Sequence, residues 1–297
     1  MDVTPPYTGR FAPSPSGPLH FGSLVTALAS YLDARAHQGQ WLVRIEDIDP
    51  PREQPGSALL ILKALENYGM IWDGEVLYQS LRTGAYQHEL ERLLKQGLLY
   101  PCTCTRKRLA GLAGVYPGYC RSKTSMPQGP YSLRLQCPDQ PVVFEDRIQG
   151  RQEQQLSALG DFILRRKDNL YAYQLAVCVD DAFQKISHVV RGYDLMDSTS
   201  KQLYLQSVLG YRQPAYAHVP VITANNTGEK LSKQNHAAPL PLDEPRPLLI
   251  KAMNVIGVDL DISLNHCSVE EIIHWGVKHW RINNIIQSSS IPLPPLS

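Results

Sequence analysis

The order of predicted elements in the first hundred residues indicates an α/β protein with a doubly wound parallel sheet. Apolar residues at helical spacing follow Leu24, and strand-like runs at 41–45 and 76–78 separate this segment from two further helical ones. Strands that alternate with helices in this way are typical of βαβ units. Residues 171–181 and 186–192 read as two more strands of the sheet. Later helices are predicted at 198–209, 245–257 and 268–279.

The composition describes an ordinary soluble globular protein, long enough for about two domains. Of its 297 residues 43% are hydrophobic and 19% charged, and the formal charge of +1 argues against nucleic-acid binding by bulk electrostatics. Local basic clusters lie at Arg106–Arg108 and Arg165–Lys167, where a solvated surface is the alternative to an RNA contact. The first residues do not read as a signal peptide, and no apolar run is long enough to span a membrane. We therefore expect a cytoplasmic protein.

The segment 9–23 predicts a phosphate-binding loop. Its prolines stiffen the chain, Gly17 and Gly22 allow backbone to approach a ligand closely, and a helix begins where the loop ends. The first turn of such a helix offers unpaired N–H groups to an anion, and His20 lies at that turn as a further hydrogen-bond donor. The loop is not of the Walker type, and a proline-rich turn before an ordinary helix is the alternative, because a single glycine-rich loop is a weak signal.

Charged residues at the predicted strand ends indicate a ligand with both an amine and a carboxylate. Glu46 follows the strand 41–45, where it would neutralise an amine. Arg191 lies at the end of the strand 186–192, where its fork suits bidentate capture of a carboxylate. Lys230 and Lys233 flank a serine in a polar loop, and two cations there suit a polyphosphate leaving group. An exposed lysine loop without function is the alternative for this last motif.

Three cysteines in one short segment make a metal site plausible. Zinc takes four N, S or O ligands, and Cys102, Cys104 and Cys120 supply three thiolates. No histidine lies between the second and third cysteine, so a fourth ligand is not evident and free structural thiols stay an alternative. The remaining cysteines fit no ligand spacing and are expected to be buried apolar thiols, namely Cys137, Cys178 and Cys267.

Several motifs in the right order resemble the catalytic core of class I aminoacyl-tRNA synthetases of the glutamyl type. Residues 10–22 are similar to the first signature of that family, with His20 to Ser23 in the place of its HIGH element, and Lys230–Gln234 looks like its KMSKS signature. Between them, 42–49, Tyr173 and 188–192 match segments of the glutamate site. The resemblance covers about residues 7 to 260.

The resemblance implies a class I synthetase Rossmann-like sheet and a set of site residues. It implies glutamate binding by Arg10, Phe11, Ala12, Pro13, Ser14, Glu46, Tyr173 and Arg191. It implies catalysis by His20, Lys230 and Lys233, and ATP binding by His20, Gly22, Ser23 and Lys233. ATP would enter with Mg²⁺, and the protein is expected to be a monomer.

Two departures point to a particular branch of this family. We expect no helical anticodon-binding domain like that of the glutamyl enzymes, and the cysteine pattern looks most like that of the glutamyl-Q tRNA(Asp) synthetases. In that branch three cysteines and a tyrosine hold one Zn²⁺, which implies Cys102, Cys104, Tyr116 and Cys120 as ligands here. The implied activity is transfer of L-glutamate to the queuosine base in the anticodon of tRNA(Asp).

Gln234 in place of the last KMSKS serine and Tyr193 in place of an acid are further departures. Three alternatives also stay open: a minimal synthetase that charges tRNA(Glu), a non-catalytic binding protein, and a nucleotidyltransferase on the same fold. The expected domains are 1–98 and 179–240 as two halves of the catalytic domain, 99–178 as an insertion with the zinc site, and 241–297 as a short C-terminal helical extension.

Overall fold

Two groups of mostly parallel strands form the centre of the protein and meet at Thr8 and Ser187. The Ser187 N–H donates to the Thr8 carbonyl oxygen at 2.9 Å, and the Ser187 hydroxyl accepts from the Thr8 N–H at 2.8 Å. The first group runs parallel in the order β1 (Thr8–Phe11), β2 (Gln40–Ile45) and β3 (Leu77–Tyr78). The second contains the parallel strands β9 (His188–Gly192), β10 (Ala215–Val219) and β6 (Pro141–Asp146), with β7 (Gly150–Gln155) antiparallel at its edge. This computed structural model describes residues 6–112, 115–123, 125–224, 238–259 and 266–293.

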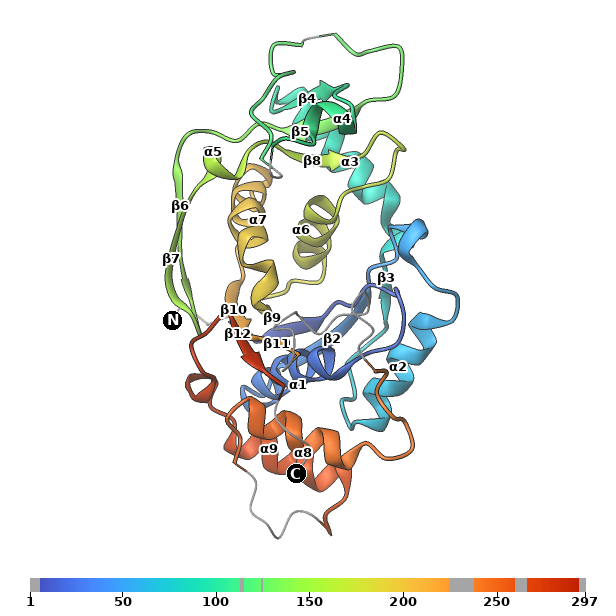
Figure 1. The fold of residues 1–297 in the computed structure, drawn as a ribbon, viewed down its shortest axis with the longest axis vertical. Helices are drawn as coiled ribbons and strands as arrows, with labels where there is room; N and C mark the ends of the chain where they lie inside the picture. The colour runs from blue at the N-terminus through green and yellow to red at the C-terminus, as the bar shows by residue number, and fades with distance from the viewer. Residues whose placement is uncertain (1–5, 113–114, 124, 225–237, 260–265, 294–297) are drawn as a thin grey trace.

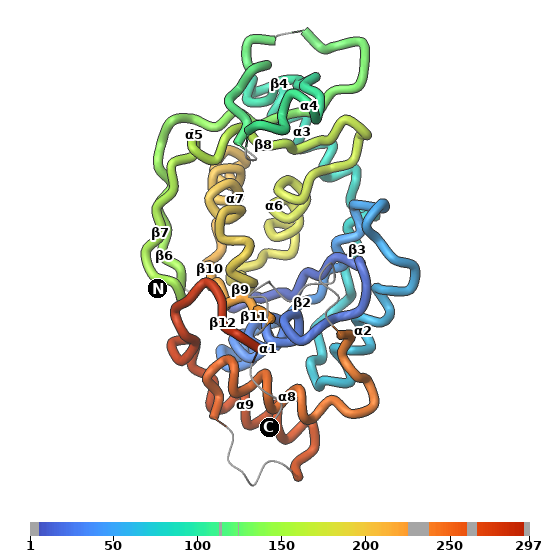
Figure 2. The backbone as a smooth tube through the Cα atoms, in the orientation of Figure 1, coloured from blue at the N-terminus to red at the C-terminus, as the bar shows by residue number. Residues whose placement is uncertain are grey.

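Helices cover the strands from two sides, as expected for a doubly wound α/β protein. In Figure 1 and Figure 2, α6 (Tyr173–Phe183) and α7 (Met196–Leu209) lie above the strands, whereas α1 (Phe21–Ala36), α8 (Arg246–Val255) and α9 (Val269–His279) lie below. The remaining longer helices are α2 (Ser57–Asn67) and α3 (Thr83–Lys95). Short helical turns are η1 (Pro50–Arg52), η2 (Gln79–Arg82), α4 (Arg106–Leu109), α5 (Leu156–Leu159), η3 (Tyr193–Leu195) and η6 (Ile282–Asn284).

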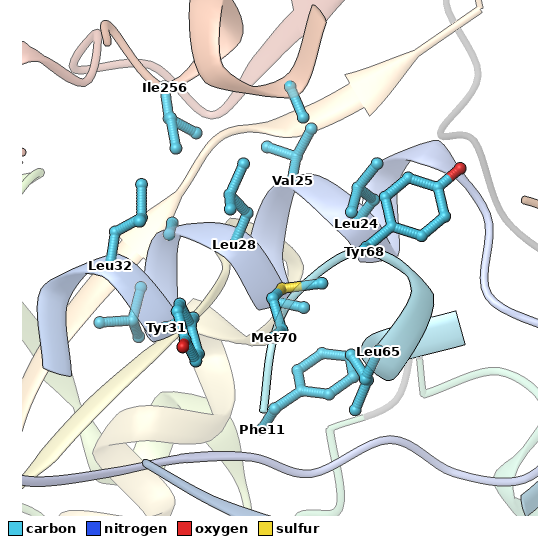
Figure 3. Packing of buried hydrophobic residues seen from close by; sticks show 14 of the residues in the cluster. Phe11, Leu24, Val25, Leu28, Tyr31, Leu32, Leu65, Tyr68, Met70 and Ile256 are labelled. Atoms are coloured by element: carbon cyan, nitrogen blue, oxygen red, sulfur yellow. The ribbon is translucent and has the colours of Figure 1, made fainter. Parts of the chain in front are cut away.

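Helix α1 is the centre of the largest hydrophobic core. Leu24, Leu28 and Leu32 repeat at four-residue spacing and are fully buried, and Figure 3 shows them facing side chains that include Met70 and Ile256. Burial of each such side chain stabilises the fold by about 1.5–3 kcal/mol. The core therefore holds α1, and with it the loop that precedes α1, in a fixed position.

A smaller lobe lies at the upper end of the molecule in Figure 1. Its antiparallel sheet contains β4 (Leu99–Cys102), β5 (Ser132–Leu135) and β8 (Phe162–Arg165), and a separate cluster of buried side chains joins it to α3, α6 and α7. The β6–β7 hairpin also comes from the segment 99–178, yet it pairs with β10 of the central strands. Strands β11 (Val221–Thr223) and β12 (Ser290–Pro292) form a parallel pair.

The prediction of a strand at 171–181 is wrong, because these residues contain helix α6. Leu175 to Val179 are all buried between neighbouring elements, so the segment shows neither the alternation of a strand nor the polar face of a surface helix. A short, continuously apolar run does not distinguish the two. The helix sends Asp180 and Asp181 in different directions: Asp180 accepts hydrogen bonds from Gln79 and Tyr86, whereas Asp181 pairs with arginines elsewhere. The other predicted helices and strands are confirmed within a few residues of their ends.

Candidate active site

A cavity of about 730 Å³ opens where β1, β2 and β9 end. The carboxyl ends of parallel strands share one edge of a sheet, which is where ligands bind in open α/β folds. The cavity gathers every described residue for which the sequence predicts a role in glutamate or ATP binding. These are Arg10, Phe11, Ala12, Pro13, Ser14, His20, Gly22, Ser23, Glu46, Tyr173 and Arg191.

The two predicted catalytic lysines, Lys230 and Lys233, lie outside the described residues. The chain re-enters the described part beside the first turn of α1. There the Leu240 N–H donates to the Leu19 carbonyl oxygen at 2.9 Å, and Pro239 forms a β-bridge with His20. Pro239 and Leu240 are therefore anchored at the cavity wall.

His20 is the N-cap of α1. Its backbone is extended (φ −120°, ψ 174°), and its Nδ1 accepts a hydrogen bond from the Ser23 N–H at 3.2 Å. An Nδ1 that accepts places the proton of a neutral ring on Nε2. The imidazole ring thus caps the helix through Nδ1. Its Nε2–H is the hydrogen-bond donor that the sequence predicts. Gly22 and Ser23 of the following turn line the cavity, and a helix N-terminus in this place suits an anion.

Glu46 is a buried acid at the end of β2. Its backbone N–H donates to the Pro13 carbonyl oxygen at 3.0 Å, which ties the strand end to the loop before α1. The carboxylate lies 3.6 Å from Arg44 Nη2. Burial raises the pKa of Glu46 to about 6, although Arg44 and Arg10 act in the opposite direction. The side chain is therefore an anion at neutral pH and becomes neutral in mildly acidic solution.

Arg10 is not a free cation, because it forms an ion pair with Asp181. Arg10 Nε lies 3.3 Å from Asp181 Oδ1, and Arg44 Nη2 lies 2.8 Å from the same oxygen. Burial opposes the charge of Asp181, but Arg10 and Arg44 outweigh it and hold the pKa of this carboxyl below its usual value. A substrate carboxylate at Arg10 would share its guanidinium with this resident anion.

Arg191 has a different environment. It is 4% exposed, and its guanidinium donates to Gln202 Oε1 at 2.8 Å, Thr199 Oγ1 at 2.7 Å and the Tyr173 hydroxyl at 3.4 Å. No ion pair within the described ranges includes Arg191. Burial raises the pKa of Tyr173, so its phenol stays protonated and able to donate. Arg191 and Tyr173 together present a cation and a hydroxyl to the cavity.

The thiols of Cys102, Cys104 and Cys120 meet in the upper lobe, away from this cavity. All three are buried, and their sulfur atoms lie within 4.8 Å of one another. The hydroxyl of Tyr116 lies 3.3 Å from Cys102 Sγ and 3.4 Å from Cys104 Sγ. The structure thus brings together the four residues that the resemblance implies as zinc ligands.

Three of the distances among these four atoms fit a tetrahedral zinc ion. With Zn–S bonds of about 2.3 Å and a Zn–O bond of about 2.0 Å, tetrahedral angles place two sulfurs about 3.8 Å apart and a sulfur and an oxygen about 3.5 Å apart. Cys104 Sγ and Cys120 Sγ lie 3.7 Å apart, and the two sulfur–oxygen distances are 3.3 and 3.4 Å. Burial opposes ionisation of Cys102, but hydrogen bonds outweigh it and lower the pKa of this thiol to about 7. Burial raises the pKa of Cys104 and of Tyr116, so these two groups favour their protonated forms when no metal is bound.

Comparison with known proteins identifies the family. The family described as tRNA synthetases class I (E and Q), catalytic domain, matches residues 7–115 and 118–283. The chain is 52% identical over 98% of its length to a glutamyl-Q tRNA(Asp) synthetase of Pseudomonas fluorescens, covering 97% of that protein. It is 50% identical over 98% of its length to the protein of the same name in Pseudomonas aeruginosa, covering 99% of it. The chain belongs to the glutamyl-Q tRNA(Asp) synthetase family.

Solved structures agree with this family membership. The chain resembles a glutamate tRNA ligase from Elizabethkingia meningosepticum, solved with its amino acid, with a TM-score of 0.81 and 26% identity. It resembles a glutamate-tRNA synthetase from Elizabethkingia anophelis with a TM-score of 0.83 and 26% identity. These matches cover 97% and 98% of the chain and 67% and 68% of the two structures. The fold is therefore the class I synthetase α/β fold with a parallel sheet.

Within this family fold, the structure adds contacts that the sequence did not predict. Arg166 forms an ion pair with Asp49 at 3.0 Å, and both residues line the cavity. Lys167 Nζ donates to the carbonyl oxygens of Thr103 and Cys104, each at 2.8 Å. The second predicted basic cluster is thus engaged within the chain. Arg106–Arg108, by contrast, are exposed on α4.

The three cysteines outside the Cys102–Cys104–Cys120 cluster differ in burial. Cys137 and Cys178 are buried, as predicted, whereas Cys267 is partly exposed, so its prediction is wrong. In the described ranges no helix is both long enough and apolar enough to cross a bilayer.

Proposed function

We propose that this protein activates L-glutamate with ATP and transfers the glutamyl group to the queuosine base in the anticodon of tRNA(Asp). The observation that carries this proposal is the sequence identity of about 50% to relatives named glutamyl-Q tRNA(Asp) synthetase, over nearly their whole length. The cavity supports it independently, because it places an acid, a cation and a helix N-terminus around one space.

The first reaction is attack of the glutamate α-carboxylate on the α-phosphorus of ATP. The carboxylate is ionised at neutral pH, so no general base is required, and pyrophosphate leaves as the new P–O bond forms. Catalysis then depends on positioning and on stabilisation of phosphate charge. His20, Gly22 and Ser23 would contact the phosphates at the start of α1. Lys233, helped by Lys230, would stabilise the departing pyrophosphate.

Glutamate would be recognised by charge at both ends. Glu46 would pair with the α-ammonium group, and Arg191 with Tyr173 would receive a carboxylate. Because Arg191 is buried among neutral acceptors, it attracts an anion more strongly than an exposed arginine would. Arg10, together with the backbone of 11–14, would complete the pocket while its charge is shared with Asp181.

The upper lobe would bind metal and RNA. Cys102, Cys104, Tyr116 and Cys120 would hold one structural Zn²⁺, which would cross-link the segment between β4 and β5. The exposed Arg106–Arg108 would contact RNA phosphates. Magnesium would accompany ATP.

The proposed domains are 1–98 and 179–240 for catalysis, 99–178 for the insertion and 241–297 for the helical extension. We expect the protein to be a monomer in the cytoplasm.

One experiment tests the proposal against its alternatives. The protein is incubated with ATP and labelled glutamate, and with tRNA(Asp) containing queuosine, tRNA(Asp) lacking queuosine, or tRNA(Glu). We expect label to enter only the first RNA. Label in tRNA(Glu) would instead identify a synthetase that charges that tRNA. Absence of glutamate-dependent ATP–pyrophosphate exchange under the same conditions would contradict the enzymatic proposal altogether.

A further inference from the structure

Arg191 is held in place by hydrogen-bond acceptors that carry no charge. Besides Thr199 and Gln202, the acceptor for its Nε–H is Nε2 of His218, at 3.2 Å. Thr199 Oγ1 lies 3.0 Å from the same histidine nitrogen. His218 is fully buried on β10 and is not among the residues that line the cavity. It therefore contacts the proposed glutamate ligand only through Arg191.

A second buried contact determines which nitrogen of His218 carries the proton. Asp146 Oδ2 lies 2.6 Å from His218 Nδ1, and both side chains are fully buried. Asp146 Oδ1 accepts from the backbone N–H groups of Ile148 and Gln149 at 3.0 and 2.8 Å. An anion so well supplied with donors favours Nδ1–H on the histidine. Because a guanidinium can only donate, Nε2 must then be the acceptor.

We propose that Asp146 and His218 are positioning residues that orient the Arg191 guanidinium for the substrate carboxylate without forming an ion pair with it. This inference rests on the proposed role of Arg191 in glutamate binding. A carboxylate in the place of His218 would hold the arginine equally well but would neutralise it, as Asp181 does for Arg10. A histidine with a proton on Nε2 would direct an N–H at the arginine Nε–H. A neutral imidazole with its lone pair on Nε2 accepts the hydrogen bond from Arg191 and adds no negative charge.

Two amide substitutions separate the two contacts of the ring. A glutamine amide reaches approximately to the position of histidine Nε2, so His218→Gln keeps an acceptor for Arg191. An asparagine amide reaches approximately to that of Nδ1, so His218→Asn keeps the contact with Asp146 and loses the one with Arg191. Glutamate-dependent ATP–pyrophosphate exchange is measured for both variants, at varied glutamate and at varied ATP.

We expect His218→Asn to raise the KM for glutamate by about 10- to 100-fold, the usual loss for a hydrogen bond to a charged group, with little change in kcat or in the KM for ATP. His218→Gln should stay within about threefold of the original protein in all three constants. Asp243→Asn, at an exposed acid shortly before α8, is the matched control and should change nothing. Equal KM values for the two His218 variants, or a worse value for His218→Gln, would overturn the proposal.

Two further measurements keep the outcome clear. Nitrogen NMR of the unaltered protein should show His218 neutral at pH 7 with its proton on Nδ1, and a proton on Nε2 would overturn the inference even if every variant failed to fold. Arg191→Gln tests the premise separately. If that variant keeps the original KM for glutamate, the proposed glutamate site is wrong. If it raises the KM and His218→Asn does not, only the positioning role is wrong.

Discussion

Asp181 and Arg10 form a buried ion pair, with Asp181 Oδ1 3.3 Å from Arg10 Nε, and Arg44 contacts the same carboxylate oxygen at 2.8 Å. Arg10, the first residue of the first signature, is thus paired with an acid inside the protein. The charge of Arg191 stays available to a ligand. The two arginines that the sequence assigns to glutamate binding therefore differ: Arg10 is held in an internal ion pair, and Arg191 forms none within the described residues.

Loss of Asp181 should destabilise the protein strongly. Asp181→Asn leaves Arg10 and Arg44 buried without their shared anion, and breaking a buried pair in this way costs about 3–5 kcal/mol. The free energy of unfolding is measured by denaturant titration at pH 7. Asp243→Asn, at an exposed acid shortly before α8, serves as the control and should change it by less than about 0.5 kcal/mol. A similarly small change for Asp181→Asn would contradict the role assigned to this ion pair.

Glu46→Gln should raise the folding stability of the protein and weaken its binding of glutamate. The folded pKa of about 6 lies above the ordinary value of 4.5, so the charge of Glu46 costs the folded state about 2 kcal/mol at pH 7. Removing it should raise the free energy of unfolding by up to that amount. The KM for glutamate should rise at least about tenfold, because a partner of the α-ammonium is lost. Destabilisation at pH 7 would show that burial does not penalise this carboxylate.

The same pKa gives a pH dependence of glutamate use. Above pH 6 Glu46 is ionised and can pair with the α-ammonium, whereas below pH 6 it is protonated and neutral. In the exchange reaction, kcat/KM for glutamate should therefore fall as the pH drops through about 6. The KM for ATP should not follow the same curve. Glu46→Gln should flatten the profile in this range, and an unchanged profile in that variant would assign the titration to another group.

Removal of zinc should affect stability rather than adenylation. We expect about one zinc per chain by metal analysis, and its loss in Cys120→Ser together with a lower melting temperature. Exchange of ATP and pyrophosphate should persist, because the thiols lie in the upper lobe and outside the cavity lining. Cys267→Ser, at a partly exposed cysteine, is the control. Full zinc content in Cys120→Ser would contradict the ligand set.

Lys233→Ala should reduce kcat of the exchange reaction by about 100- to 1,000-fold, the usual loss when one donor to transition-state charge is removed. The KM for glutamate should change little, since the lysine is assigned to the phosphates. Lys63→Ala, at an exposed lysine of α2, controls for the loss of one positive charge. Exchange unaffected by Lys233→Ala would defeat the assignment of this lysine to the leaving group.

The sequence predicted the parts of the site that depend on consecutive residues. The loop 9–23 contains its own turn chemistry, and its helix begins where the glycine and the histidine indicate. Strand ends likewise located Glu46 and Arg191. These features are local, so spacing and residue type are enough to recognise them.

The parts that it missed depend on long-range pairing. Asp181 meets Arg10 across 171 positions, and His218 meets Asp146 across 72. Asp181 was visible as one of two adjacent acids, but nothing in the sequence indicates its partner. His218 lies in an ordinary buried strand and carries no local signal at all. Helix α6 was mistaken for a strand because every side of its middle section is buried.

The adjacent acids of α6 also fix the rotation of that helix. Successive residues of an α-helix point about 100° apart, so Asp180 reaches the η2–α3 region while Asp181 reaches the arginines of β1 and β2. A single residue inserted between Ala176 and Val179 would turn both carboxylates away from their partners at once. Helix α6 can therefore pair both acids at only one rotation about its axis. An insertion or deletion inside the helix changes that rotation, so the pairing constrains the length of α6 as well as its composition.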